Sequence, residues 1–139
     1  MNAKRVSSDN ITKLNKHEIF VFGSNKQGQH KGGAAAYAFA HFGAEWGVGE
    51  GITGQCYALP TMSGILDLID SIHKFVRYAK LCSIFMPWRK FLVTKVGCGI
   101  AGYSVYGVAT IFKGCGAFKL KNLYMPEDFY AVLEEHKIL

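Results

Sequence analysis

Apolar residues along this chain gather in short runs that alternate with segments of helical periodicity. Four β-prone runs predict strands, at residues 18–22, 55–60, 90–94 and 122–125, and the first of them reads as a buried central strand. Four other segments predict helices, at residues 34–42, 65–83, 104–113 and from Pro126 onward. The clearest helix is 65–83, where apolar residues recur at helical spacing, at Leu66, Ile69, Ile72, Val76 and Ala79.

Strands that alternate with helices imply an α/β fold. We expect a single three-layer domain over residues 1–139, with a mixed, largely parallel sheet and helices on both of its faces. The chain is 50% hydrophobic and only 19% charged, a composition that is typical of a packed globular domain and excludes a disordered one. No internal repeat or low-complexity linker divides the chain.

Two of the predicted strands lead through a glycine-rich loop into a predicted helix. The first loop covers residues 26–33, and the second, residues 95–103, contains Gly97, Gly99 and Gly102. Residues without a Cβ let the main chain approach a ligand closely, and the unpaired N–H groups at a helix start attract phosphate. Both loops are therefore candidate ligand loops. The alternative is that the glycines only make tight turns.

Two literal motif matches do not fit their context. Gly49–Gly54 reads G-x-G-x-x-G, but it runs into the β-like run at 55–60 instead of following a strand and opening a helix, so we reject a dinucleotide-binding fingerprint. Gly23–Gly28 has the outer spacing of a P-loop, but Gln29 stands where that motif requires lysine. A Walker-type nucleotidase is not predicted.

Charge and cysteine usage set the broad class. The net charge of +6 and the pI of about 9.2 favour anionic partners such as nucleotides or nucleic acid, or else reflect scattered solubilising charge. The four cysteines form no C-x-x-C pair, which predicts reduced, mostly buried thiols and a cytoplasmic protein. The five histidines show no metal-ligand spacing, so we expect neither a metal nor a cofactor.

Membrane features are missing from the pattern. No apolar run approaches the ~20 residues that a membrane span needs, and residues 1–10 lack the apolar core of a signal peptide. We therefore expect no membrane partner. The pattern makes no prediction of oligomeric state.

Three segments together resemble one known family. They are Ile19-Phe-Val-Phe-Gly-Ser-Asn25, Gly32-Gly-Ala-Ala, and Val96-Gly-Cys-Gly-Ile-Ala-Gly-Tyr103. They are similar to the first strand, the first helix entry and the second glycine loop of the macro domain superfamily, and most closely resemble small bacterial and phage-associated macro-like proteins. Asn10-Ile-Thr is similar to the Asp-Ile-Thr segment near that family's adenine pocket.

The resemblance implies a macro-like domain that binds ADP-ribose or a related adenine- or pyrophosphate-containing nucleotide metabolite. It assigns Asn25 to the distal ribose, with Tyr103 packed against that sugar, and Asn10 to the adenine. The remaining implied ligand-binding residues are Gln29, Gly32, Gly33, Gly97, Gly99, Ile100, Ala101 and Gly102.

Catalysis is a separate question. His30 is the titratable side chain inside the first loop, so His30 and Asn25 are the candidate catalytic residues, with Gln29 able to orient a water against an ADP-ribosyl derivative. The alternative is a solvated or ligand-orienting His30. Cys98 lies where helix-start N–H groups could lower its pKa, or else it is a small buried hydrophobe. The first loop lacks the aspartate that several macro hydrolases use, so turnover and passive binding both stay open.

Two rival functions come from other classes. A basic module that binds single-stranded nucleic acid is motivated by the charge of +6 and by aromatic residues such as Trp46, Trp88 and Tyr103. Against it, basic residues are not interleaved with these aromatics in one segment. The other rival is a host-interaction or scaffold module without catalysis.

Overall fold

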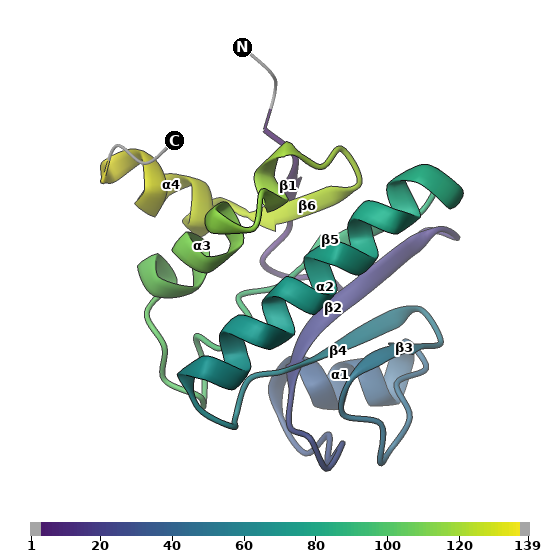
Figure 1. The fold of residues 1–139 in the computed structure, drawn as a ribbon. Helices are drawn as coiled ribbons and strands as arrows, with labels where there is room; N and C mark the ends of the chain where they lie inside the picture. Colours follow the sequence, from purple (N-terminus) through teal and green to yellow (C-terminus); the bar gives the residue numbers. More distant parts are fainter. Residues whose placement is uncertain (1–3, 137–139) are drawn as a thin grey trace.

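The computed structural model describes residues 4–136, so the expectation for the first ten residues falls partly outside it. Within this range six strands form one sheet in the order β1-β6-β5-β2-β4-β3 (Figure 1). The strands are β1 (Val6–Ser7), β2 (Glu18–Ser24), β3 (Gly51–Thr53), β4 (Cys56–Pro60), β5 (Lys90–Val93) and β6 (Leu123–Pro126). The helices are α1 (Gly33–His41), α2 (Ile65–Phe85), α3 (Val105–Gly114), the short 3-10 helix η1 (Ala117–Lys119) and α4 (Glu127–Glu135).

The sheet is mixed but largely parallel. β2 pairs in parallel with β4 on one side and with β5 on the other, and β6 and β1 continue the parallel series. Only the edge strand β3, among the described strands, runs antiparallel, to β4. The predicted α/β domain with a largely parallel sheet is confirmed.

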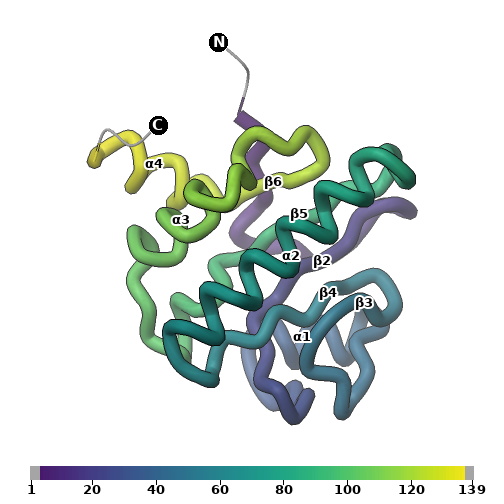
Figure 2. The backbone as a smooth tube through the Cα atoms, in the orientation of Figure 1, coloured from purple at the N-terminus to yellow at the C-terminus, as the bar shows by residue number. Residues whose placement is uncertain are grey.

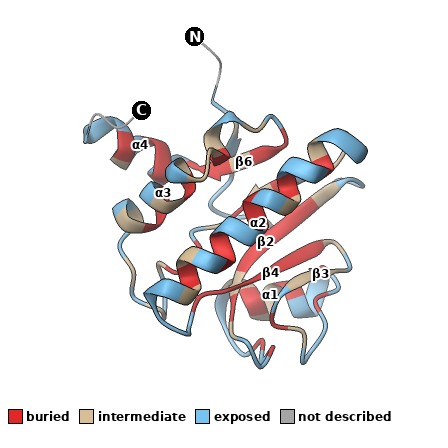
Figure 3. Ribbon diagram, in the orientation of Figure 1, coloured by how far each residue is buried: buried red, intermediate tan, exposed pale blue. Residues whose placement is uncertain are grey.

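The sheet is the middle one of three layers. Helix α1 covers one of its faces, and α2, α3 and α4 cover the other (Figure 2). Successive side chains of β2 point to opposite faces of the sheet, so this strand contributes to the core on both sides. Phe20 and Phe22 pack with the buried residues on the α1 side, whereas Ile19 and Val21 pack with those on the α2 side. A central strand buried on both faces reads as a continuous apolar run, as residues 18–22 do. Figure 3 shows this buried strand between partly exposed helices.

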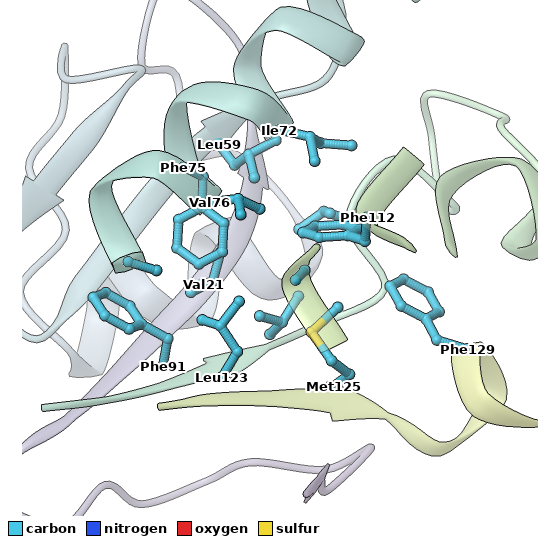
Figure 4. Packing of buried hydrophobic residues seen from close by; sticks show 14 of the residues in the cluster. Val21, Leu59, Ile72, Phe75, Val76, Phe91, Phe112, Leu123, Met125 and Phe129 are labelled. Carbon is cyan, nitrogen blue, oxygen red and sulfur yellow. The ribbon is translucent and has the colours of Figure 1, made fainter. Parts of the chain in front are cut away.

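The larger core lies between the sheet and α2, α3 and α4 (Figure 4). Phe75 of α2 is fully buried and meets Phe91 of β5 edge to face, with ring centroids 5.5 Å apart. Phe112 of α3 continues this contact to Phe129 of α4 at 5.8 Å. Aromatic pairs in such geometry contribute about 0.5–1.5 kcal/mol beyond their buried area. They fix the helices that follow β4, β5 and β6.

The chain reverses direction in the sheet beside β2. From β2 it passes through α1 on one face to β4, whereas from the adjacent β5 it passes through α3 on the other face to β6. The loops that leave the carboxyl ends of β2 and β5 therefore diverge to opposite faces. Open α/β sheets bind their ligands in the crevice at such a point.

No helix among residues 4–136 combines the length and the apolar character needed to cross a membrane.

Candidate functional site

A cavity of about 640 Å³ lies at the carboxyl ends of β2, β4 and β5. We call residues 25–32, between β2 and α1, the first glycine loop, and residues 94–104, between β5 and α3, the second glycine loop. The cavity is lined by both loops, the start of α1, the segment 8–11 and the end of β4. Its predicted lining residues are Asn10, Asn25, Gln29, Gly32, Gly33, Gly97, Gly99, Ile100 and Ala101. The structure thus brings together two loops that are some seventy residues apart in the sequence.

Asn25 lies at the cavity, but its side chain is already bonded within the first glycine loop. Its Nδ2 donates to the Gln29 carbonyl at 3.0 Å, and its Oδ1 accepts from the Gln29 N–H at 2.9 Å. Both polar ends of the amide are therefore used, in a turn that Asn favours. The side chain fixes the loop, and the ribose contact that the resemblance implies would have to use the second N–H of this amide or a further lone pair of its oxygen.

The first glycine loop is supported from behind by the segment 45–49. A Cβ on Gly28, whose φ is +68°, would lie within 2.8 Å of the Gly47 Cα and would overlap the main chain between Gly47 and Val48. A Cβ on Gly49 would overlap the carbonyl of Asn25. The Ser24 hydroxyl donates to the Gly49 carbonyl, and the Gly47 N–H donates to the Gly28 carbonyl at 3.0 Å. Main chain packs directly on main chain, which requires glycine.

The same contacts explain the Gly49–Gly54 motif. Its first glycine supports the first loop, and residues 51–53 form the edge strand β3, which pairs with β4. The motif therefore opens a hairpin, and its rejection as a dinucleotide-binding turn is confirmed by this context.

His30 is not brought to the cavity. It is 2% exposed, and its Nε2 lies 2.9 Å from the Glu45 carbonyl. Its ring packs against Phe22, Phe39 and Trp46, on the side of the loop away from the cavity. The expectation of a solvated His30 is wrong, and the pairing of His30 with Asn25 around a substrate does not occur here. The contact with the carbonyl of Glu45, 15 residues further along the chain, holds the ring in this buried position.

The start of α1 opens into the cavity. Gly32 and Gly33 are exposed, line the cavity, and have no atom within 4 Å of an added Cβ. Gly32 is the N-cap, and it supplies no side chain to accept from the first-turn N–H groups. These unpaired donors, together with the helix dipole, favour an anion.

The start of α3 is different. The Ser104 hydroxyl accepts from the Gly107 N–H at 2.9 Å, so this helix is capped by its own serine. Neither Ser104 nor any residue of α3 is among the residues that line the described cavity. The second glycine loop therefore contributes its own main chain to the cavity, not the end of its helix.

The second glycine loop folds by hydrogen bonds within its main chain. Gly102 N–H donates to the Gly99 carbonyl at 2.9 Å, and Tyr103 N–H donates to the Gly97 carbonyl at 2.9 Å. The Ile100 side chain is 90% exposed at the cavity edge. Gly102 and Tyr103 do not line the cavity, and Tyr103 packs against the core below Gly97. The contact between Tyr103 and a distal ribose is not supported by this position.

Charged groups around the cavity are mostly basic. Lys31 and Lys95 line it together with Asp9. Lys95 Nζ bonds the Asp128 carboxylate at 3.0 Å, which raises the pKa of Lys95, and Lys31 makes no ion pair within residues 4–136. With Asp9 and Asp128 counted against the two lysines these four groups carry no net charge, so Lys31, which has no carboxylate partner among residues 4–136, is the cation best placed to meet an anion.

Cys98 lies in the second glycine loop but is not activated by it. Burial raises the pKa of its thiol, with Lys95 opposing that shift, so of the two alternatives the lowering by helix-start N–H groups is not found. Its S–H donates to the Val96 carbonyl at 3.6 Å, and it is packed against the core. The interpretation of Cys98 as a small, partly buried hydrophobe is the one that fits.

Several residues that line the cavity were not among the predicted site residues. Asp9 precedes Asn10 in the segment 8–11, and Lys31 separates His30 from Gly32. Thr61, Met62 and Thr94 follow the carboxyl ends of β4 and β5. The signal that could have found them is positional, because residues directly after parallel strands meet at the ligand edge of the sheet.

Within residues 4–136 no cluster of three or more His, Cys, Asp or Glu side chains is arranged to hold a metal ion. The chain was also compared with models of protein families, with curated proteins and with solved structures, and no match was found. The cavity and its two loops are therefore the basis for the functional argument.

Proposed function

We propose that the cavity binds ADP-ribose or a related adenine- or pyrophosphate-containing nucleotide. The observation that carries the proposal is the position of the cavity, at the reversal point of the sheet between an uncapped helix start and a second glycine loop. Its volume of about 640 Å³ falls in the range of roughly 300–1,000 Å³ that is usual for small-molecule and cofactor sites. The resemblance to macro domains supports the same ligand class.

The diphosphate is the part of the ligand for which the site offers most. The unpaired N–H groups at the start of α1 would bind one phosphate, and main-chain N–H groups at Gly97 and Gly99 would bind the other. Lys31 makes no ion pair within the described residues and would add charge-assisted hydrogen bonds. Small residues on both sides let the main chain reach the phosphate oxygens.

The adenine would lie at the segment 8–11. Asp9 and Asn10 offer acceptors for the exocyclic amine, and Ile11 and Tyr37 offer apolar surface for the ring. The Tyr37 hydroxyl donates to the Thr12 carbonyl at 3.0 Å, which holds this segment against α1. The distal ribose would then meet Gln29, which is exposed and also lines the cavity.

Binding is the proposal, and no catalytic step is assigned. His30 faces away from the cavity, and the Asn25 amide is bonded to Gln29 main chain. A general acid or base must reach the reacting group within hydrogen-bond distance. His30, the titratable one of the two predicted catalytic residues, does not meet that requirement in this arrangement.

Calorimetric titration with ADP-ribose, AMP, ADP and ribose 5-phosphate tests the proposal. We expect a dissociation constant on the order of 1 μM for ADP-ribose and weaker binding of each fragment. Gly99→Glu should abolish binding, because Gly99 lines the cavity with no atom near an added Cβ, so the carboxylate would fill the diphosphate position without disturbing the fold.

Gly114→Glu is the matched control. Gly114 is also exposed and has no atom near an added Cβ, but it ends α3 and does not line the cavity. It carries the same change of net charge and should bind ADP-ribose as the native chain does. Flat titrations for all four ligands, or equal losses in both variants, would contradict the proposed site.

A further inference from the structure

The end of the molecule opposite the cavity carries a protruding apolar tip. We use this name for Leu81, Ile84 and Phe85 in the last turns of α2, together with Trp88 in the turn that follows. Their exposed fractions are 53%, 64%, 71% and 55%. In Figure 1 the end of α2 extends past the sheet beside the beginning of β2. Large apolar side chains gathered at one exposed point indicate an interaction site.

Basic residues surround this tip, and acidic residues are scarce. From residue 71 to residue 94, which covers most of α2, the turn after it and β5, the chain contains five lysines and arginines and no aspartate or glutamate. Arg77 and Lys80 are exposed on α2, and each lies four residues before an apolar residue of the tip, Leu81 and Ile84 respectively, so they share that face of the helix. Neither takes part in an ion pair within the described residues.

Neighbouring segments add further basic groups to the same end. The Lys90 N–H donates to the His17 carbonyl at 3.0 Å, which places Lys16 and His17 beside the turn that carries Trp88. The rings of His17 and Trp88 meet edge to face at 6.5 Å. Asn122 Nδ2 donates to the Ala79 carbonyl at 2.9 Å, which brings the adjoining, exposed Lys121 to α2. Glu18 is also at this end, with its carboxylate bonded to the Asn15 N–H.

Along the axis of α2, the basic side chains lie further from the tip of the molecule than the apolar ones. A rise of 1.5 Å per residue places Lys80 about 6 Å, and Arg77 about 10 Å, before Ile84 along the helix axis. Apolar groups that enter a bilayer interface reach a depth of about 5–10 Å, and lysine and arginine extend their ends to the headgroups above them. The order of basic and then apolar residues toward the tip matches that arrangement.

We propose that the apolar tip docks this protein on an anionic lipid surface. A second copy of the chain does not fit, because a symmetric contact at the tip would bring two basic surrounds together. A single-stranded oligonucleotide would use basic and aromatic groups, but Leu81 and Ile84 offer no ring on which a base could stack. A lipid interface accepts aliphatic and aromatic side chains alike.

This orientation leaves the nucleotide cavity accessible, since the cavity lies at the other end of the strands. The proposal does not depend on the ligand of that cavity. It replaces the sequence-based expectation of no membrane partner, which rested on the lack of a spanning segment, whereas docking at an interface requires none.

Sedimentation with vesicles tests the proposal, with the Trp46→Phe variant supplying a spectroscopic reading. In that variant Trp88 is the sole tryptophan. We expect binding to vesicles that contain about one third phosphatidylserine, a blue shift of Trp88 emission, and at least tenfold weaker binding to pure phosphatidylcholine. Phe85→Ser should weaken binding roughly tenfold, and Lys80→Gln roughly fivefold, because each basic group near an anionic surface is worth about that factor.

Leu66→Ser is the matched control, since Leu66 is 79% exposed on the same helix but lies at its cavity end. It should bind vesicles as the native chain does. The proposal would be overturned by no binding to anionic vesicles, by equal binding to both compositions, or by an equal loss in Leu66→Ser. Phe85-dependent binding of an oligonucleotide, or a Phe85-dependent dimer, with no vesicle binding would assign the tip to a different occupant.

Discussion

The two glycine loops face the same cavity but are held in different ways. The first packs its main chain directly against residues 45–49 and is fixed by the Asn25 side chain and the buried His30. The second is closed by hydrogen bonds within its own main chain and leaves Ile100 almost fully exposed. The first leads into an uncapped helix, whereas the second leads into a helix capped by Ser104.

Because the loops are held differently, their glycines have different structural roles. In the first loop, Gly28 has no room for a Cβ because another segment lies behind it, so it preserves the fold. In the second loop, Gly99 has open space around it, so it leaves room for a ligand. A glycine-rich motif therefore contains positions that the packing requires and positions that are open, and only the surroundings of each residue distinguish them.

Gly28→Ala should show the largest effect. An added methyl group would overlap the main chain of Gly47 and Val48, and the φ of +68° adds strain, so we expect the free energy of unfolding to fall by about 3 kcal/mol. Gly99→Ala, with neither constraint, should change it by less than about 0.5 kcal/mol. Urea unfolding followed by circular dichroism measures both. Equal losses in the two variants would remove the distinction between the loops.

Asn25→Ala should have the next largest effect. It removes two hydrogen bonds to Gln29 main chain, and at about 1 kcal/mol each the free energy of unfolding should fall by about 2 kcal/mol even without ligand. Asn25→Asp keeps the acceptor for the Gln29 N–H but loses the donor, so about half of that loss is expected. Unchanged stability of Asn25→Ala in the absence of ligand would show that its side chain does not fix the loop.

The two helix starts should respond in opposite ways to changes at the cap. Ser104→Ala should lower the free energy of unfolding by about 1 kcal/mol and leave ADP-ribose affinity unchanged. Gly32→Ser, at an extended N-cap residue, should raise stability by a few tenths of a kcal/mol but weaken ADP-ribose binding, because the hydroxyl would compete for the first-turn N–H groups. Thermal unfolding and calorimetry on both variants test this. Tighter binding by Gly32→Ser would show that those groups are not used by the ligand.

Most of the architecture follows from local pattern. The continuous apolar run at 18–22 and the helical spacing in 65–83 each reflect the face that the element buries, so they predict β2 and α2 closely. The two-residue strand β1 and the three-residue strand β3 are too short to show a period. They form because β6 and β4 supply the pairing. Helix α2 also runs to Phe85, beyond the predicted Ser83, into the exposed tip.

The candidate site was less predictable than the fold. Glycine spacing correctly indicated Gly32 and Gly99 as cavity residues, since both follow strands in a parallel sheet. The direction of His30 depends on the Glu45 carbonyl and on Trp46, which no local pattern relates to it. The gathering of Lys16, Trp88 and Lys121 at one end likewise comes from segments far apart in sequence, so the sequence could not show basic and aromatic residues together there.

In the proposed function, the two glycine loops form one nucleotide site. An amide NMR titration of the ¹⁵N-labelled protein with ADP-ribose tests it most directly. We expect saturable shifts at Gly33, Ala34, Gly97 and Gly99 with a single dissociation constant, and none at Lys80 or Phe85, which lie at the far end of α2. Unshifted loop amides at saturating ADP-ribose, or shifts in only one of the two loops, would contradict it.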